Sequence, residues 1–327
     1  QVRGIFAPMM PARKTQEELV RIVIFGSKKE YAPYRLNDYA AAYYSGGAER
    51  DSIVLGDAAT QIFPIAVHEY VHLVARHSGL SLPPWLSEGL AELYSTLEPR
   101  GKQVLVGSLI PGRRQALSRS TWVPLSQILA ADRSSAYYNE KDKAGSLYNE
   151  GWALTHMLAL SAPYRQQFPS LVNAISGGED SVKALERIYS KPLAKIEDDL
   201  LAYLDGVLFQ AVLLPAAAEK AEGPSPSRPV DGFDLEMALL ELHVSPERES
   251  EVRQRLERLA AENPNRPEPL VRMGYDALRR GQPAQARQEF AKAFDLGAQS
   301  RKMLWDYGRL AAGESPARGV SVFQRLL

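Results

Sequence analysis

The feature that most constrains the fold is an H-E-x-x-H element, HEYVH from His68 to His72, set in an apolar segment. On a helix, residues four apart lie one above the other on the same face, so two imidazoles can converge on one ion while Glu69 stands beside it to handle a proton. Pro64 near the start, apolar residues within the segment and Gly79 after its end all predict a helix here. The fold must therefore accommodate a mostly buried helix that carries a polar cluster.

A metal ion is the interpretation that we favour for this cluster. The alternative is a buried helix whose histidines are satisfied by hydrogen bonds. Two buried imidazoles and a carboxylate within ~6 Å would be costly without an ion to organise them, which argues for a metal. The chain has no cysteine, so the ligands must be His and carboxylate groups, a donor set that favours Zn²⁺.

A second helix is predicted directly downstream, in PPWLSEGLAELYSTL, with Pro84 in its first turn and an apolar stripe along it. Glu88 falls beside that stripe, sixteen residues after His72, which allows the second helix to return antiparallel to the first. We expect Glu88 to be the third ligand. Glu92, one turn later, competes for that role; otherwise it accepts a hydrogen bond from a ligand imidazole or is a partly exposed helix charge. His77 points elsewhere on the first helix and is expected at the surface.

HEYVH followed by WLSEGLAE resembles the gluzincin metallopeptidases, in which a downstream helix with the pattern W-L-x-E-G-x-A supplies the third zinc ligand. Aminopeptidase N with its relatives, and smaller bacterial peptidase-MA-like proteins, share this arrangement. The glutamate before glycine in that pattern matches Glu88. LYNEGWALTHML, Leu147 to Leu158, is similar to the Y-E-K-G helix of the aminopeptidase N group, whose tyrosine stabilises the oxyanion, and the matching residue is Tyr148. The resemblance covers roughly Ser52 to Ala162.

The resemblance implies a zinc-dependent peptidase. Zinc held by His68, His72 and Glu88 would lower the pKa of a water molecule, Glu69 would remove its proton as general base, and Tyr148 would hydrogen-bond the tetrahedral oxyanion. The G-x-M-E-N element, with which aminopeptidase N relatives recognise a substrate N-terminus, has no counterpart before the histidine segment. Exopeptidase specificity is therefore not carried over.

Three further residues and one strand have two interpretations each. His156, two helical turns after Tyr148, is either a second oxyanion or pocket group or a packed helix histidine. Trp85 and Trp152 are expected in the core or in the pocket wall. The strand candidate SIVLG, Ser52 to Gly56, would hold an extended peptide across the metal if it lay at a sheet edge. An ordinary internal strand is the equally weighted alternative.

The first two thirds of the chain are expected to form one α+β domain over residues 1–214. Leu19 to Phe25 is rich in β-branched residues and predicts a strand, and Gln103 to Ile110 predicts another strand or hairpin arm. From about Ser126 to Leu214 the pattern is helical. With the resemblance, this order implies a thermolysin-like zincin domain with a small N-terminal sheet and a helical lobe.

An all-α domain is expected over residues 233–327, after a linker at residues 215–232 that is rich in Pro, Ala, Gly, Ser and charge. One stretch carries small and large residues at tetratricopeptide-repeat positions. These residues are Leu270, Met273, Gly274, Ala277, Gly281, Ala286, Phe290 and Ala293. Partial matches thirty-four residues on either side predict a stacked helical array, because such units bury their faces only by stacking.

Composition narrows the class of partner. Lys+Arg and Asp+Glu balance at 39 each, which removes the general electrostatic case for nucleic acid or an anionic membrane. No run of about eighteen apolar residues occurs, so no membrane span is predicted. The chain begins at Gln1, from which we expect an upstream signal peptide or anchor and an extracytoplasmic location, with a cytoplasmic one as the alternative.

Three functions compete at this level. The first is a peptidase acting on a peptide or protein substrate. The second is a scaffold that recruits protein partners through the helical repeats and keeps a structural or inactive zinc site. An intact Glu69 and Tyr148 argue against the scaffold, because a structural site needs neither. The third is a zinc hydrolase that acts on a non-peptide amide or ester.

Overall fold

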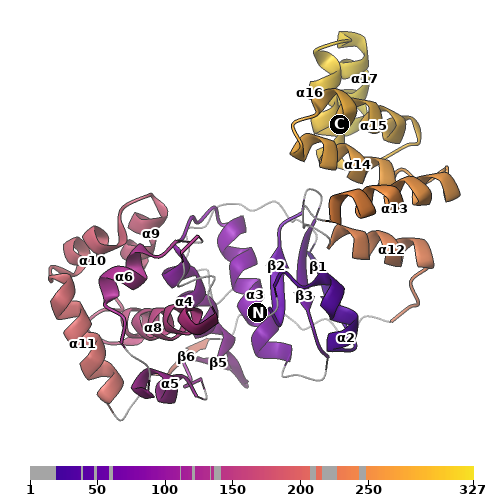
Figure 1. Cartoon of the computed structure of the whole chain (residues 1–327). Coiled ribbons are helices and arrows are strands. Elements are labelled where there is room, and N and C mark those ends of the chain that lie inside the picture. The colour runs from indigo at the N-terminus through magenta and orange to yellow at the C-terminus, as the bar shows by residue number, and fades with distance from the viewer. Residues whose placement is uncertain are drawn as a thin grey trace.

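The computed structural model describes residues 20–37, 40–47, 50–58, 62–110, 112–119, 122–132, 134–135, 141–206, 211–215, 227–242 and 248–327. Over these residues the protein is mixed α+β, as predicted, and it has many helices and two small sheets (Figure 1). None of the described helices combines the length and the apolar character that crossing a bilayer requires.

The first sheet is three-stranded and has the order β1-β3-β2. Its strands are β1 (Val20–Ile24), β2 (Ala42–Ser45) and β3 (Asp51–Leu55), and β3 runs parallel to β1 and antiparallel to β2. The predicted strands at Leu19 to Phe25 and Ser52 to Gly56 are confirmed within one residue at each end. The edge hypothesis for the second of them is wrong, because β3 is hydrogen-bonded on both sides.

Each face of this sheet is covered by a different part of the chain. α3 (Ile62–His77) lies against β2 and β3 on one face, where Ile53 and Leu55 join the main core. A short helix, α2 (Lys28–Tyr31), and the 3-10 turn η1 (Ala32–Tyr34) follow β1. Figure 1 shows α3 between the sheet and a lobe of further helices. The zinc-ligand helix expected from sequence is thus the connection between the two parts.

The helical lobe is built on one close helix crossing, between α4 (Pro84–Ser95) and α8 (Lys141–Leu160). A Cβ atom on Gly89 would lie 2.1 Å from Thr155 Oγ1 and 2.7 Å from the Gly151 carbonyl oxygen, so only glycine allows this approach. The fully buried Trp85 belongs to the same core. The remaining helices of the lobe are α5 (Arg113–Arg119), α6 (Leu125–Ala130), α9 (Phe168–Ser176), α10 (Ser181–Tyr189) and α11 (Leu193–Asp205).

A second, antiparallel sheet closes the lobe in the order β4-β5-β6. Its strands are β4 (Glu98–Arg100), β5 (Gln103–Val106) and β6 (Val212–Pro215). The strand expected at Gln103 to Ile110 is confirmed for its first half. The prediction of helix as far as Leu214 is wrong at its end, because the last helix stops at Asp205 and the chain returns to pair with β5. Exposed and partly buried residues alternate along β6, which is the two-residue period of a strand.

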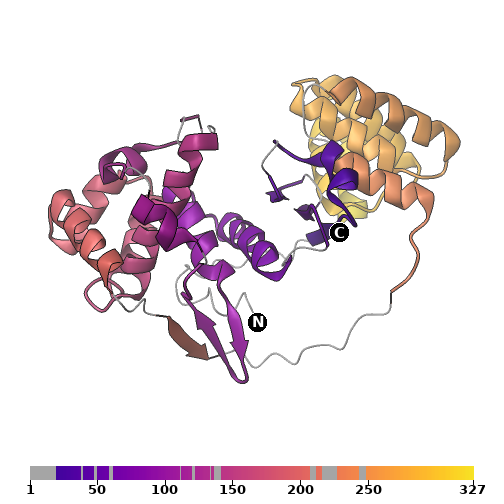
Figure 2. The ribbon, with the colours of Figure 1, turned by 60° about the horizontal axis from the view of Figure 1, so that its bottom comes forward.

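The C-terminal region consists of helix pairs, and its first helix packs on the free face of the three-stranded sheet. The helices are α12 (Gly232–Glu241), α13 (Glu249–Glu262), α14 (Glu268–Arg279), α15 (Pro283–Asp295), α16 (Arg301–Ala312) and α17 (Pro316–Leu326). Leu242, directly after α12, shares a cluster with Phe25, Tyr31, Tyr43 and Val54 of the sheet region. Figure 2 accordingly shows these helices beside the sheet, on the side away from the lobe.

The same contact recurs in two of the helix pairs. A Cβ atom on Gly274 in α14 would lie 2.3 Å from the Phe290 ring in α15, and one on Gly308 in α16 would lie 2.6 Å from the Phe323 ring in α17. Each glycine therefore receives the aromatic ring of the following helix. Residues 216–226 of the predicted linker lie outside the described residues.

Candidate metal centre

Three expected ligands come together between α3 and α4. The Nε2 atoms of His68 and His72 are 3.3 Å apart. Glu88 Oε2 lies 3.3 Å from His68 Nε2 and 3.6 Å from His72 Nε2. One ligand atom from each residue lies within 4.8 Å of the other two, so the cluster could hold a metal ion. The four-residue spacing on α3 produces the histidine pair, and the turn between the helices brings in Glu88.

The spacing of these atoms suits a small tetrahedral ion. Ligand atoms at ~2.0–2.1 Å from zinc lie about 3.4 Å from one another when they are arranged tetrahedrally. The three separations of 3.3, 3.3 and 3.6 Å match that value. The donor set of two imidazole nitrogens and one carboxylate oxygen is also one that zinc accepts.

The outer nitrogens of both histidines have polar neighbours. His72 Nδ1 lies 3.2 Å from the Ser87 hydroxyl. His68 Nδ1 lies 3.9 Å from Glu92 Oε1, within ion-pair range but beyond a hydrogen bond, on the ring edge opposite to the one that faces Glu88. Glu92 thus lies on the outer side of the His68 ring, whereas Glu88 faces the Nε2 atoms of both histidines.

Arg113 ties this site to the rest of the lobe. Its guanidinium donates to Glu92 and, through Nη1, to Asn149 Oδ1 at 2.7 Å. Sequence reasoning missed both Arg113 and Ser87. Ser87 could have been considered because it precedes Glu88 on the same helix, but nothing in the sequence singles out Arg113, which stands twenty-one residues beyond Glu92.

Burial and charge set the protonation of the two site carboxyl groups in opposite directions. Burial by itself would raise the pKa of Glu88, but hydrogen bonds with His68 and His72 outweigh it and bring that pKa to about 2. Burial dominates at Glu69, where it raises the pKa of a carboxyl that is 8% exposed. Burial would lower the pKa of His68, yet the neighbouring Glu88 gives a net increase. Glu88 is thus an anionic carboxylate, whereas Glu69 is a carboxyl biased towards accepting a proton.

Tyr148 lies on the face of α8 that meets α4. Gly151, three residues later and on the same helix face, is one of the residues that contact α4, and a Cβ atom on it would lie 2.9 Å from the Trp85 carbonyl oxygen. The Tyr148 side chain is half-buried, one helical turn before that contact. Its neighbour Asn149 is the residue that Arg113 binds. The structure therefore ties the helix of Tyr148 to that of Glu88 through two contacts.

No family model, curated protein or solved structure matches this chain. The geometry of the His68, His72 and Glu88 cluster and its neighbours is therefore the feature that points to a function.

His156 is placed in the core of the lobe. It is fully buried, its Nε2 donates to the Gly107 carbonyl at 2.8 Å, and its Nδ1 accepts from the Tyr203 hydroxyl at 2.7 Å. Burial lowers its pKa, so the ring is neutral. Trp152, also fully buried, lies edge-on to this imidazole with the ring centroids 5.5 Å apart. Both side chains thus pack in the interior of the helical lobe, and the pocket role considered for them is not supported.

His77 departs from its expected place at the surface. Its Nε2 lies 2.5 Å from Oδ2 of Asp51, a carboxylate that is 1% exposed at the start of β3. His77 does lie away from His68, His72 and Glu88, as its position on the helix predicts. The expected exposure is wrong because the strand that covers this end of α3 cannot be inferred from the helix sequence.

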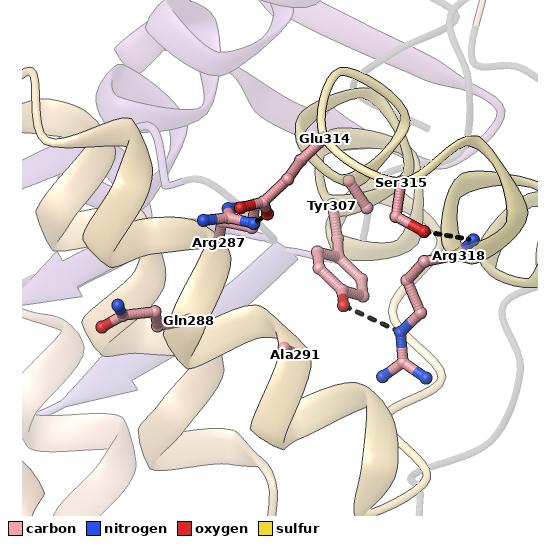
Figure 3. Close-up of a pocket in the computed structure, with 8 residues that line it drawn as sticks. Arg287, Gln288, Ala291, Tyr307, Glu314, Ser315 and Arg318 are labelled. Atoms are coloured by element: carbon pink, nitrogen blue, oxygen red, sulfur yellow. Dashed lines mark hydrogen bonds and ion pairs between the residues drawn. The ribbon is translucent and has the colours of Figure 1, made fainter.

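A pocket elsewhere in the molecule lies among α15, α16 and α17 and shares no residue with the histidine cluster (Figure 3). Arg287 there is paired with Glu314, and Arg318 donates to the Tyr307 hydroxyl at 3.0 Å and to Asp295 at 2.5 Å. Arg287 and Arg318 are therefore already paired with carboxylates, and this pocket offers no cluster of potential metal-binding groups like that of His68, His72 and Glu88.

Proposed function

We propose that this protein is a zinc-dependent peptidase of the gluzincin type. The observation that carries the proposal is the convergence of His68, His72 and Glu88 at tetrahedral spacing, with the buried Glu69 beside them. A structural zinc site would need the three ligands but no neighbouring carboxyl with a raised pKa. In this proposal the three-stranded sheet, α3 and the lobe form the zincin domain, and the C-terminal helix pairs form a tetratricopeptide-like array.

Zinc, when bound by these residues, would supply a Lewis acid that polarises the peptide carbonyl and acidifies water. Glu69 takes the proton from the attacking water and passes it to the leaving amine, which is the work of a general base followed by a general acid. The burial that raises its pKa moves this carboxyl towards the range in which both steps are efficient near neutral pH.

Tyr148 is assigned to the tetrahedral oxyanion, to which its hydroxyl would donate a hydrogen bond worth ~3 kcal/mol of the barrier. The support is its place on the α8 face that meets α4. Arg113 would hold that part of α8 through Asn149 while also binding Glu92.

Three forms of the full chain test the proposal: wild type, Glu69→Gln and Glu88→Gln. We expect wild type to bind about one zinc per chain and to hydrolyse peptides. Glu69→Gln should keep the zinc and lose at least ~100-fold in kcat, because the general base is gone. Glu88→Gln should weaken zinc binding, because a neutral amide replaces an anionic ligand. Metal content by mass spectrometry and peptide cleavage by chromatography give the two readouts.

The matched control is Glu262→Gln, a carboxyl-to-amide change on the exposed surface of α13. It should leave both zinc content and cleavage unchanged. A wild-type chain that binds no added zinc would refute the metal site. A zinc-loaded wild type that cleaves no peptide in a mixed library would instead favour a scaffold with a structural ion or a hydrolase of non-peptide bonds.

A further inference from the structure

Arg113 bridges the two helices that cross in the helical lobe. Its Nη1 atom donates to Asn149 Oδ1 on α8 at 2.7 Å, and its Nη2 atom donates to Glu92 Oε1 on α4. The two bonds use different nitrogens of one planar guanidinium, so both form at once. The side chains of Arg113 and Glu92 are only 21% and 12% exposed, which limits competition from water. One side chain from the start of α5 thereby ties α4 to α8.

Glu92 joins this bridge to the candidate metal centre. It lies one helical turn after Glu88 on α4, and the oxygen that accepts from Arg113 is also the one that lies 3.9 Å from His68 Nδ1. On the opposite edge of the same ring, His68 Nε2 faces Glu88 at 3.3 Å. The Glu92 carboxylate is thus held between the guanidinium on one side and a candidate zinc ligand on the other.

Asn149 joins the bridge to Tyr148. The two residues are consecutive on α8, so a bond that holds the Asn149 side chain also restrains the helical turn that carries Tyr148. The contact at Gly89 and Gly151 sets how closely α4 and α8 approach, but a single crossing point allows the helices to pivot. Glu92 lies three residues after Gly89, about 4.5 Å along α4. Asn149 lies two residues before Gly151, about 3 Å along α8. The attachment through Arg113 is therefore away from the crossing, where it restrains that pivot.

We propose that Arg113 is a positioning residue: by binding Glu92 and Asn149 together, it sets where Tyr148 stands relative to the zinc ligands. This inference rests on the proposed function for the roles of zinc and Tyr148. Lysine would carry the same charge but lacks the planar fork, and one ammonium on a flexible chain holds two partners on different helices poorly. The role of Arg113 therefore depends on the geometry of its guanidinium and not on its charge alone.

The first experiment compares Arg113→Lys with Arg258→Lys in the zinc-loaded full chain. Arg258 is exposed on α13, so its substitution is the matched control and should leave peptide cleavage unchanged. Arg113→Lys should lower kcat about 10-fold with KM and zinc content unchanged, because a small displacement of a group that acts in the transition state is costly. Asn149→Ala should cause a similar loss, whereas Asn173→Ala, at an exposed position of α9, should cause none.

A double variant separates the positioning of Tyr148 from a general effect on the fold. Tyr148→Phe removes the hydroxyl and should lower kcat about 100-fold. Adding Arg113→Lys to Tyr148→Phe should then change kcat less than ~2-fold, because the group that Arg113 positions is already gone. A further loss of ~10-fold in the double variant would overturn the inference. So would a loss of zinc from Arg113→Lys that accounts for its whole effect on cleavage.

The bridge itself is measured without zinc or peptide, by NMR of the full chain with isotope-labelled arginine. A guanidinium held through both Nη atoms gives separate Nη–H signals, because rotation about its Cζ–Nη bonds is restricted, whereas a solvated one gives an averaged signal. Wild type should give separate signals for Arg113, Asn149→Ala should average them, and Asn173→Ala should leave them separate. Averaged signals in wild type would overturn the inference. If the zinc-loaded wild type cleaves no peptide, the proposed function fails by itself, and these signals still decide whether Arg113 bridges α4 and α8.

Discussion

Glu150 on α8 is a buried carboxyl whose raised pKa should lower stability as the pH rises from about 4.5 to about 7. It is fully buried, its Oε1 accepts a hydrogen bond from the Val123 backbone N–H at 3.1 Å, and its Oε2 has no hydrogen-bond partner within the described residues. Burial raises its pKa to about 7, with a further contribution from the nearby carboxylate of Glu197. The group is therefore protonated in the folded protein at mildly acid pH.

The sign of the effect follows from the two pKa values. Below the ordinary value of 4.5 the carboxyl is protonated in both the folded and the unfolded chain. As the pH rises towards about 7, the unfolded chain releases this proton while the folded chain retains it, which lowers the free energy of unfolding. At 1.36 kcal/mol per pKa unit, the total loss is about 3 kcal/mol. Glu150→Gln keeps the shape of the side chain and removes the ionisation.

We expect the stability advantage of Glu150→Gln over wild type to grow by about 2 kcal/mol between roughly pH 5 and roughly pH 8. Urea denaturation followed by tryptophan fluorescence measures it, since Trp85 and Trp152 are fully buried in the same core. Glu262→Gln, on the exposed surface of α13, is the control and should show no such growth. An advantage that is the same at both pH values would refute the reasoning.

Two packing contacts give further predictions. Gly89→Ala should cost ~1–3 kcal/mol of unfolding free energy, because its Cβ atom would collide with Thr155 on α8. The control Gly145→Ala, at an exposed helix position with nothing within 4 Å of the new Cβ atom, should add up to ~1 kcal/mol. Similar denaturation midpoints for the two variants would contradict the close packing of α4 on α8. Leu242→Ala, at a residue 2% exposed between the sheet and α12, should cost ~2–5 kcal/mol by the same measurement, and a loss under ~0.5 kcal/mol would mean that this contact does not hold the two parts together.

The candidate site was predictable from sequence where helix geometry alone decides positions. His68 and His72 converge because they are four residues apart on α3, and Glu88 joins them because the following helix begins after a short turn. Pro64, Gly79 and Pro84 indicated where the two helices begin and end for the same local reason. Where a neighbour distant in the chain decides, the prediction failed, as for the exposure of His77, which Asp51 covers.

The strand order could not be derived from the sequence. Whether β3 is central depends on its pairing with β2 (Ala42–Ser45), a four-residue segment for which no strand was predicted. Likewise β6 is a strand because it returns to β5, more than one hundred residues earlier in the chain. Such long-range pairing leaves little local signal in a segment this short. Arg113 is missed for the same reason, since its role comes from two partners on different helices.

Leu242 packs in one cluster with residues of the three-stranded sheet. The linker region therefore separates two parts of the chain that differ in composition but depend on each other for folding. Phe25, Tyr43 and Val54 are each at most 8% exposed, and Leu242 is part of what shields them. A shortened chain ending at Pro215 would present this apolar face to water, so it should self-associate. A nick introduced between Pro215 and Gly232 would instead leave both fragments bound to one another. Purifying the two pieces together after such a cut would therefore be the natural way to handle either one.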